Sequence, residues 1–149
     1  MKNKIFLTLT IIAGLLIQMS CTTETPTDLT KTSFIPKPVK ITATGNEFEL
    51  TKSTVIFVQD ETQQSGEYLS NELNGIAGLK PEVKTTDKEP GKGIYISISE
   101  GENNLGEEGY ELTIDKKLIR ISANNSAGCF NGIQTLLQTL PVKANSDEK

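Results

Sequence analysis

Apolar residues in the last third of the chain recur with two different periods. Over residues 110–114 and 118–123 they alternate with polar residues, which is typical of strands that bury one face. The polar residues 115–117 suit a turn between these strands. Further on, the spacing becomes three or four, at Ala127, Phe130, Ile133, Leu136, Leu137 and Leu140. The pattern predicts a β-hairpin followed by a helix over residues 126–140, which ends before Pro141.

Two glycines, Gly128 and Gly132, are four residues apart in this helix and therefore share one face. A glycine inside a helix costs roughly 0.5–1 kcal/mol relative to alanine, so we expect a compensating contact. We predict that the helix backbone closely approaches the sheet there, and that Asn125 or Ser126 caps the helix. The residues expected on its outer side are polar: Asn131, Gln134 and Gln138.

Upstream of the hairpin, short strands are predicted at residues 39–43 and 47–50, on either side of a turn at Gly45 and Asn46. Residues 54–58 carry apolar side chains on both faces, as a strand covered on both sides does.

A helix is predicted over residues 61–75, because apolar residues recur there at helical spacing. We expect Asp60 to cap its start and an acidic first turn, including Glu61, to suit the helix dipole. The expected buried stripe consists of Leu69, Leu73 and Ile76. Gly75 and Gly78 are expected to end the helix.

Two further strands follow this helix. Residues 82–86 read as a weak edge strand, and in residues 94–98 isoleucines alternate with Tyr95 and Ser97, so one face is expected to be buried and the other exposed. The element order is then β-β-β-α-β-β-β-β-α. Because hairpins dominate this order, it predicts an α+β fold, with a mostly antiparallel β-sheet and two helices packed on one face.

The N-terminus has the pattern of an export signal. Lysines precede an apolar run over residues 5–17, and Cys21 follows the small residue Ser20. Residues 1–21 resemble a bacterial lipoprotein signal, in which the cysteine becomes the lipid attachment site, although Gln18 stands where that signal usually has leucine. The alternative is an ordinary secretory signal cleaved near Ser20. We expect an exported protein in the cell envelope, at the periplasm or cell surface, anchored to the membrane through lipid on Cys21.

The domain boundaries follow from the composition. Residues 22–33 are rich in threonine and polar, so we expect a flexible linker, and residues 34–142 are expected to form one folded domain. The net charge is −4, and the lysines are scattered, which argues against nucleic acid as a partner.

The chain contains no histidine, which excludes a Ser-His-Asp triad and an HExxH zinc site. We expect no cofactor and no metal. Cys129 is expected to be an unpaired small core residue. The adjacent Glu107 and Glu108 are expected to be solvated, and residues 91–93, Gly-Lys-Gly, to be a turn and not a phosphate loop. Tyr95 is the one tyrosine expected to be exposed. A single tyrosine is a poor platform for a sugar ring.

Three motifs resemble the N-terminal domain of family 20 glycoside hydrolases, the β-N-acetylhexosaminidases. They are IPKP at residues 35–38, GYELTI at 109–114 and AGCFNGIQTLLQTLP at 127–141, and the resemblance covers roughly residues 34–142. It implies a parent enzyme that removes terminal N-acetylhexosamine residues by a substrate-assisted mechanism. In that family an Asp-Glu pair carries the chemistry, in a (β/α)8 barrel that follows this domain. No position here corresponds to that pair, and residues 143–149 are expected to be a polar stub leading towards the barrel.

Three functional hypotheses follow. In the first, the chain is the non-catalytic N-terminal domain of an exported β-N-acetylhexosaminidase. It would be inactive alone, would support the catalytic barrel, and would meet glycan only through that barrel. In the second, it is a stand-alone surface lipoprotein that binds a glycan or a protein partner. In the third, it is the equivalent domain of another glycosidase, of the α-glucuronidase or O-GlcNAc hydrolase type.

Overall fold

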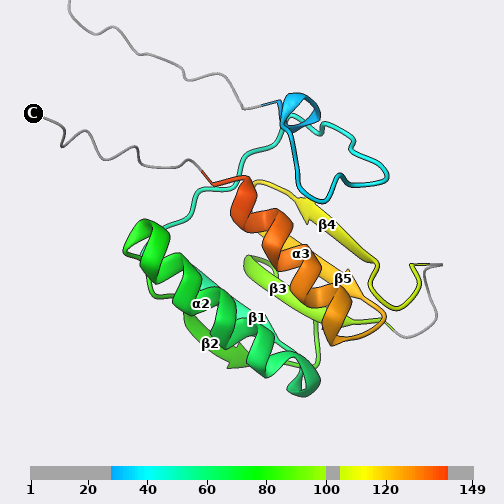
Figure 1. Ribbon diagram of the computed structural model, residues 1–149. Helices are drawn as coiled ribbons and strands as arrows, with labels where there is room; N and C mark the ends of the chain where they lie inside the picture. The colour runs from blue at the N-terminus through cyan, green and yellow to red at the C-terminus, as the bar shows by residue number, and fades with distance from the viewer. Residues whose placement is uncertain (1–27, 100–104, 141–149) are drawn as a thin grey trace, which may run out of the picture.

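The computed structural model describes residues 28–99 and 105–140 (Figure 1). The elements in chain order are η1 (Leu29–Lys31), β1 (Val55–Val58), η2 (Asp60–Thr62), α2 (Gln63–Ala77), β2 (Glu82–Thr85), β3 (Gly93–Ile98), β4 (Tyr110–Ile114), β5 (Leu118–Ala123) and α3 (Ser126–Gln138). The expected targeting segment and the expected C-terminal stub lie outside the described residues. Residues 28–33 of the expected linker contain η1, and the flexibility of the linker stays a prediction.

The five strands form a mixed sheet with the order β2-β1-β3-β5-β4. β1 pairs in parallel with β2 and with β3, and β3 pairs in parallel with β5. Among the described strands only β4 pairs antiparallel, with β5. Both helices cover one face of the sheet, which confirms the α+β class with two helices on one face (Figure 1).

The expectation of a mostly antiparallel sheet is wrong. Helix α2 carries the chain from the end of β1 back to its beginning, so that β2 enters the sheet in the same direction as β1. A crossover of this kind produces parallel pairing. The predicted hairpin of β4 and β5 is confirmed, with Tyr110 opposite Ala123 and Leu112 opposite Ile121.

The two strands expected near the beginning of the domain, at residues 39–43 and 47–50, do not form. In the first segment Val39 is fully exposed, at 107%. In the second, Phe48 and Leu50 pack against the core while Glu49 between them is exposed. Asn46 also donates from Nδ2 to Asp115 Oδ1 at 3.2 Å. The alternation in this segment therefore indicates that one face is buried, although the segment does not pair as a strand of the sheet.

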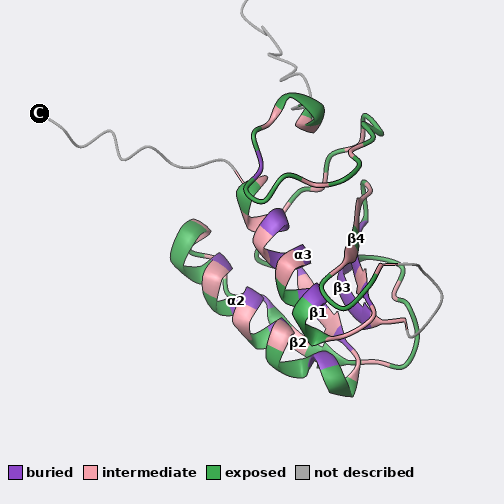
Figure 2. Ribbon diagram, turned by 45° about the vertical axis from the view of Figure 1, so that its right-hand side comes forward, coloured by how far each residue is buried: buried purple, intermediate pink, exposed green. Residues whose placement is uncertain are grey.

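The core lies between the sheet and the two helices, where buried residues concentrate (Figure 2). The strands contribute Ile56, Val58, Ile94, Ile96, Ile119, Ile121 and Ala123. The helices contribute Leu69, Leu73, Cys129, Ile133 and Leu136. Because both helices bury their apolar faces against the same sheet face, they also come into contact with each other.

Helix α3 meets the sheet through its glycines, as predicted. A Cβ atom on Gly132 would lie 2.6 Å from Ile121 Cγ2, and one on Gly128 would collide with the carbonyl oxygen of Gly109. The predicted cap is also confirmed, since Asn125 Oδ1 accepts hydrogen bonds from the first amides of the helix. The expected apolar face is partly wrong, because Ala127 and Phe130 are exposed.

Helix α2 departs from its predicted ends. Asp60 and Glu61 lie inside the preceding turn η2, where Thr62 Oγ1 accepts the amide of Gln59 at 3.0 Å. The helix ends at Gly78, whose φ of 67° is left-handed and suits glycine, as predicted. Gly75 instead lies inside the helix.

Strand β3 is buried on both faces, which corrects the expectation of one exposed face. It runs between β1 and β5, and Tyr95 on the helix-free face is only 6% exposed. Burial raises the pKa of Tyr95, and the nearby carboxylates of Glu89 and Asp87 raise it further. Glu89 lies in the β2–β3 loop and pairs with Arg120 Nε at 2.8 Å, so this loop folds back towards the sheet.

The close contact of α3 predicts opposite effects for two Gly→Ala substitutions. Gly128→Ala should destabilise the fold by about 1–3 kcal/mol, because the added methyl group meets backbone that cannot turn aside. Gly75→Ala is the matched control, since its Cβ would have nothing within 4 Å, and it should stabilise the fold by about 0.5–1 kcal/mol. Urea unfolding followed by circular dichroism measures both. Equal free energies of unfolding for the two variants would contradict the close contact.

Candidate docking face on the two helices

The structure places the sequence-predicted candidates in separate positions. Cys21, the expected lipid attachment site, lies outside the described residues. Glu107 and Glu108 are exposed in the turn before β4, and Lys92 is exposed before β3. No group of three His, Cys, Asp or Glu residues in the described part of the chain could hold a metal ion. No helix among residues 28–99 and 105–140 has the length and apolar character needed to cross a bilayer.

Cys129 is the buried core residue that the sequence predicted. It is fully buried, and its Sγ lies 3.7 Å from the carbonyl oxygen of Ser97. Burial raises the pKa of this thiol to about 11, so the neutral form dominates near neutral pH. A reactive cysteine needs the thiolate and access to solvent, and Cys129 has neither.

Tyr95 was expected to be exposed, and the structure contradicts this. Its burial against the helix-free face of the sheet removes it as a platform for a sugar ring. The exposed aromatic residue is instead Phe130, which is 48% exposed on the outer side of α3. Helical periodicity predicts a core position for Phe130, because its side chain is large and apolar.

The outer side of the two helices carries exposed and half-buried residues, several of them apolar. The rings of Phe130 and Tyr68 have centroids 5.4 Å apart and are tilted by 39°. Ile76 is two turns beyond Tyr68 on α2 and is 41% exposed. Gln134 is one turn beyond Phe130 on α3 and donates from Nε2 to the Tyr68 hydroxyl at 2.8 Å. This hydrogen bond joins the two helices across their outer side.

Gln138, one turn beyond Gln134, holds the N-terminal segment against the end of α3. Its Oε1 accepts the amide of Ile35 at 3.0 Å, and its Nε2 donates to the carbonyl oxygen of Ile35 at 3.0 Å. The same Nε2 also donates to the backbone of Gln134. The side-chain amide thus pairs with both polar groups of one residue, as a neighbouring strand would. The sequence placed Gln138 on the outer side correctly, but no local pattern signals a partner so distant in the chain.

We name Tyr68, Ile76, Phe130, Gln134 and Gln138 the helix ridge. Its two glutamine side chains are already hydrogen-bonded within the protein. A polar group that keeps such a partner costs little to remove from water, whereas an unpaired one costs a lot. The helix ridge therefore combines exposed apolar groups with satisfied polar groups, which are the properties of a surface suited to packing.

Comparison with known proteins identifies the family. A family model described as glycosyl hydrolase family 20, domain 2, matches residues 31–148. The chain belongs to glycosyl hydrolase family 20. This confirms the family resemblance of the three sequence motifs. The lipoprotein signal stays a prediction.

Relatives in family 20 are much longer than this chain. A curated beta-hexosaminidase of Porphyromonas gingivalis is 32% identical over 118 residues, which are 78% of this chain and 15% of the relative. The solved GH20 beta-N-acetylhexosaminidase of Streptomyces coelicolor A3(2) matches with a TM-score of 0.64 and 34% identity, over 71% of this chain and 21% of its own. A mutant beta-hexosaminidase of Streptomyces plicatus, in complex with the product GlcNAc, matches with a TM-score of 0.56 and 34% identity. That match covers 64% of this chain and 19% of the other.

The hydrogen bonds of Gln138 predict that its loss frees the N-terminal segment. Gln138→Ala removes both hydrogen bonds to Ile35, which should weaken local protection by about 1–2 kcal/mol. The Ile35 amide should then exchange with solvent roughly ten- to thirtyfold faster, as measured by NMR. Gln64→Ala is the matched control, because Gln64 is exposed on α2 and its side chain has no hydrogen bond to a described residue. Unchanged exchange in Gln138→Ala would contradict this arrangement.

Proposed function

We propose that the chain is the non-catalytic N-terminal domain of an exported β-N-acetylhexosaminidase. The proposal rests on the family 20 domain 2 match over residues 31–148, together with relatives of which the chain spans between 15% and 21%. The names of these relatives give their activity as that of beta-hexosaminidases, and one holds GlcNAc as product. The parent enzyme would therefore hydrolyse terminal N-acetylhexosamine residues of glycans. This chain would support that activity without carrying it out.

The partner in this proposal is the catalytic (β/α)8 barrel of the parent enzyme, and the contact surface is the helix ridge. Phe130 and Ile76 offer exposed apolar area, and burying such area drives stable association. The paired glutamines can enter the interface without losing their partners. Helix α3 ends at Gln138, which belongs to the ridge, and the family match continues to residue 148. Glycan would meet this domain only through the barrel.

Export through residues 1–21 and lipid attachment at Cys21 complete the proposal. Support comes from the sequence, where an apolar run of thirteen residues follows two lysines and precedes the small residue Ser20 and then Cys21. A single lipidated cysteine would place the domain at a membrane surface in the cell envelope. Mass spectrometry of the protein isolated from membranes tests this step, since it reports the modified N-terminal cysteine directly.

The proposal predicts that this chain alone does not hydrolyse an N-acetylhexosaminide. The purified chain should release p-nitrophenol from p-nitrophenyl N-acetylglucosaminide no faster than buffer, because the family's acid and orienting carboxylate lie in the barrel. A family 20 enzyme with its barrel serves as the positive control under identical conditions. Turnover that survives further purification of the chain would overturn the non-catalytic role.

The proposal also predicts how a single change on the helix ridge affects packing. Phe130→Asp should weaken binding to a separately produced barrel by about tenfold or more, because a charge replaces an aromatic anchor at the interface. Val39→Asp introduces the same charge at another exposed apolar position, away from the ridge, and should leave this affinity unchanged. Calorimetric titration compares the two. An equal loss in both variants would show that the ridge is not the contact surface.

A further inference from the structure

The N-terminal segment that enters the domain differs in charge from the rest of the chain. Residues 29–41, which we name the basic segment, contain Lys31, Lys37 and Lys40 and no acidic residue, whereas the whole chain has a net charge of −4. Lys31 pairs with Asp28 at 3.3 Å. Lys37 and Lys40 are exposed and form no ion pair with a described residue. Two positive charges are therefore available to an anionic partner.

The basic segment also displays two large apolar side chains to solvent. Ile35 is 82% exposed and Val39 is 107% exposed, far more than the two exposed apolar residues on the helix ridge. Apolar residues interleaved with lysines are typical of surfaces that lie on a membrane, because the apolar groups enter the headgroup boundary while the amino groups stay at the phosphates.

The structure holds the backbone of Ile35 in place. Gln138 binds both backbone polar groups of Ile35, and the neighbouring Phe34 is buried. The segment therefore does not have to be ordered anew when it meets a partner, which lowers the entropic cost of binding.

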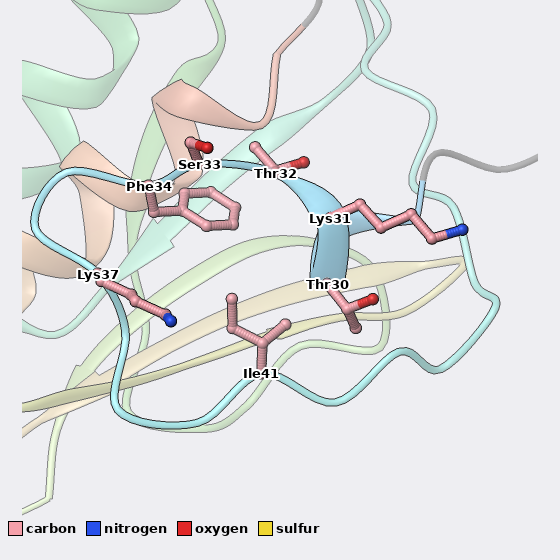
Figure 3. Close-up of a pocket in the computed structure, with 7 residues that line it drawn as sticks. All are labelled: Thr30, Lys31, Thr32, Ser33, Phe34, Lys37 and Ile41. Atoms are coloured by element: carbon pink, nitrogen blue, oxygen red, sulfur yellow. The ribbon is translucent and has the colours of Figure 1, made fainter.

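The basic segment also lines a hollow of about 390 Å³ (Figure 3). Phe34 and Ile41 face this hollow, and the Lys37 side chain extends into it. Lys31 and the hydroxyl-bearing residues Thr30, Thr32 and Ser33 also line it, although Lys31 and Thr30 are both bound to Asp28. Lys37 is therefore the ammonium group that the hollow offers to a phosphate.

The basic segment lies close to Cys21 along the chain. Residues 22–28 separate Cys21 from the basic segment. If Cys21 carries lipid, as proposed above, the basic segment is the part of the folded domain that lies closest to the anchor along the chain.

We propose that the basic segment binds the surface of a bilayer containing anionic phospholipid and so orients the domain on the membrane. Lys37 and Lys40 meet the headgroup phosphates, while Ile35 and Val39 enter the boundary of the acyl chains. This inference rests on the proposed envelope location for its biological setting, but the binding itself does not require the lipid or the barrel.

Vesicle co-sedimentation tests the proposal directly, with the chain beginning at Thr22, which retains every described residue and lacks the apolar leader. The chain should bind vesicles of phosphatidylglycerol mixed with phosphatidylcholine, and should not bind vesicles of phosphatidylcholine alone. Lys37→Ser with Lys40→Ser should weaken this binding about 25-fold, since a lysine near an anionic surface contributes about fivefold. Ile35→Ser with Val39→Ser should also weaken it, and circular dichroism checks that both variants remain folded.

Lys80→Ser with Lys88→Ser is the matched control, because it removes the same charge from two exposed positions outside the basic segment. Its affinity should stay within about twofold, since charges beyond a Debye length of the bilayer are screened. Equal weakening of both lysine variants, or no binding of the starting chain, would overturn the proposal. Barrel packing and lipidation are measured in separate experiments. A failure of vesicle binding would therefore not contradict the proposed function.

Discussion

The close contact between helix α3 and the hairpin determines how the rest of the domain is arranged. Gly128 and Gly132 bring the helix backbone onto the side chains and backbone of β4, β5 and the loop before them. This contact fixes the rotation of α3 about its axis, so that Cys129 and Ile133 point into the core. The same rotation turns Phe130 outward. A packing constraint inside the domain thereby creates the exposed aromatic group of its outer surface.

The outer surface then divides into two parts with different chemistry. The helix ridge combines exposed apolar groups with glutamines that are already hydrogen-bonded, which suits a packed protein interface. The basic segment carries free ammonium groups beside exposed apolar side chains, which suits a charged lipid surface. Gln138 belongs to the ridge and also holds Ile35 of the basic segment, so it links the two surfaces. Under the two proposals above, the domain would hold a barrel at a fixed orientation to a membrane.

Hydrophobic periodicity predicted where the helices and strands lie better than it predicted which strands pair. It located β1, β2, β3, the β4–β5 hairpin and both helices, because alternation and helical spacing are local properties. It could not order the sheet, since the parallel pairing of β1 with β3 depends on contacts between distant segments. It also placed Phe130 inside and Tyr95 outside, because the burial of both residues depends on contacts between segments that are distant in the chain. The three sequence motifs identified the family, whereas no sequence pattern predicts the hydrogen bonds of Gln138.

We propose that this domain is a scaffold completed by a catalytic barrel. Thermal unfolding of the chain, followed by circular dichroism with and without a saturating concentration of separately produced barrel, tests it most directly. A partner that binds only the folded state must stabilise it, by about 2.7 kcal/mol at a hundredfold excess over Kd. We predict a rise of several degrees in the Tm of the domain when the barrel is present. An unchanged Tm over the full range of barrel concentrations would contradict the account.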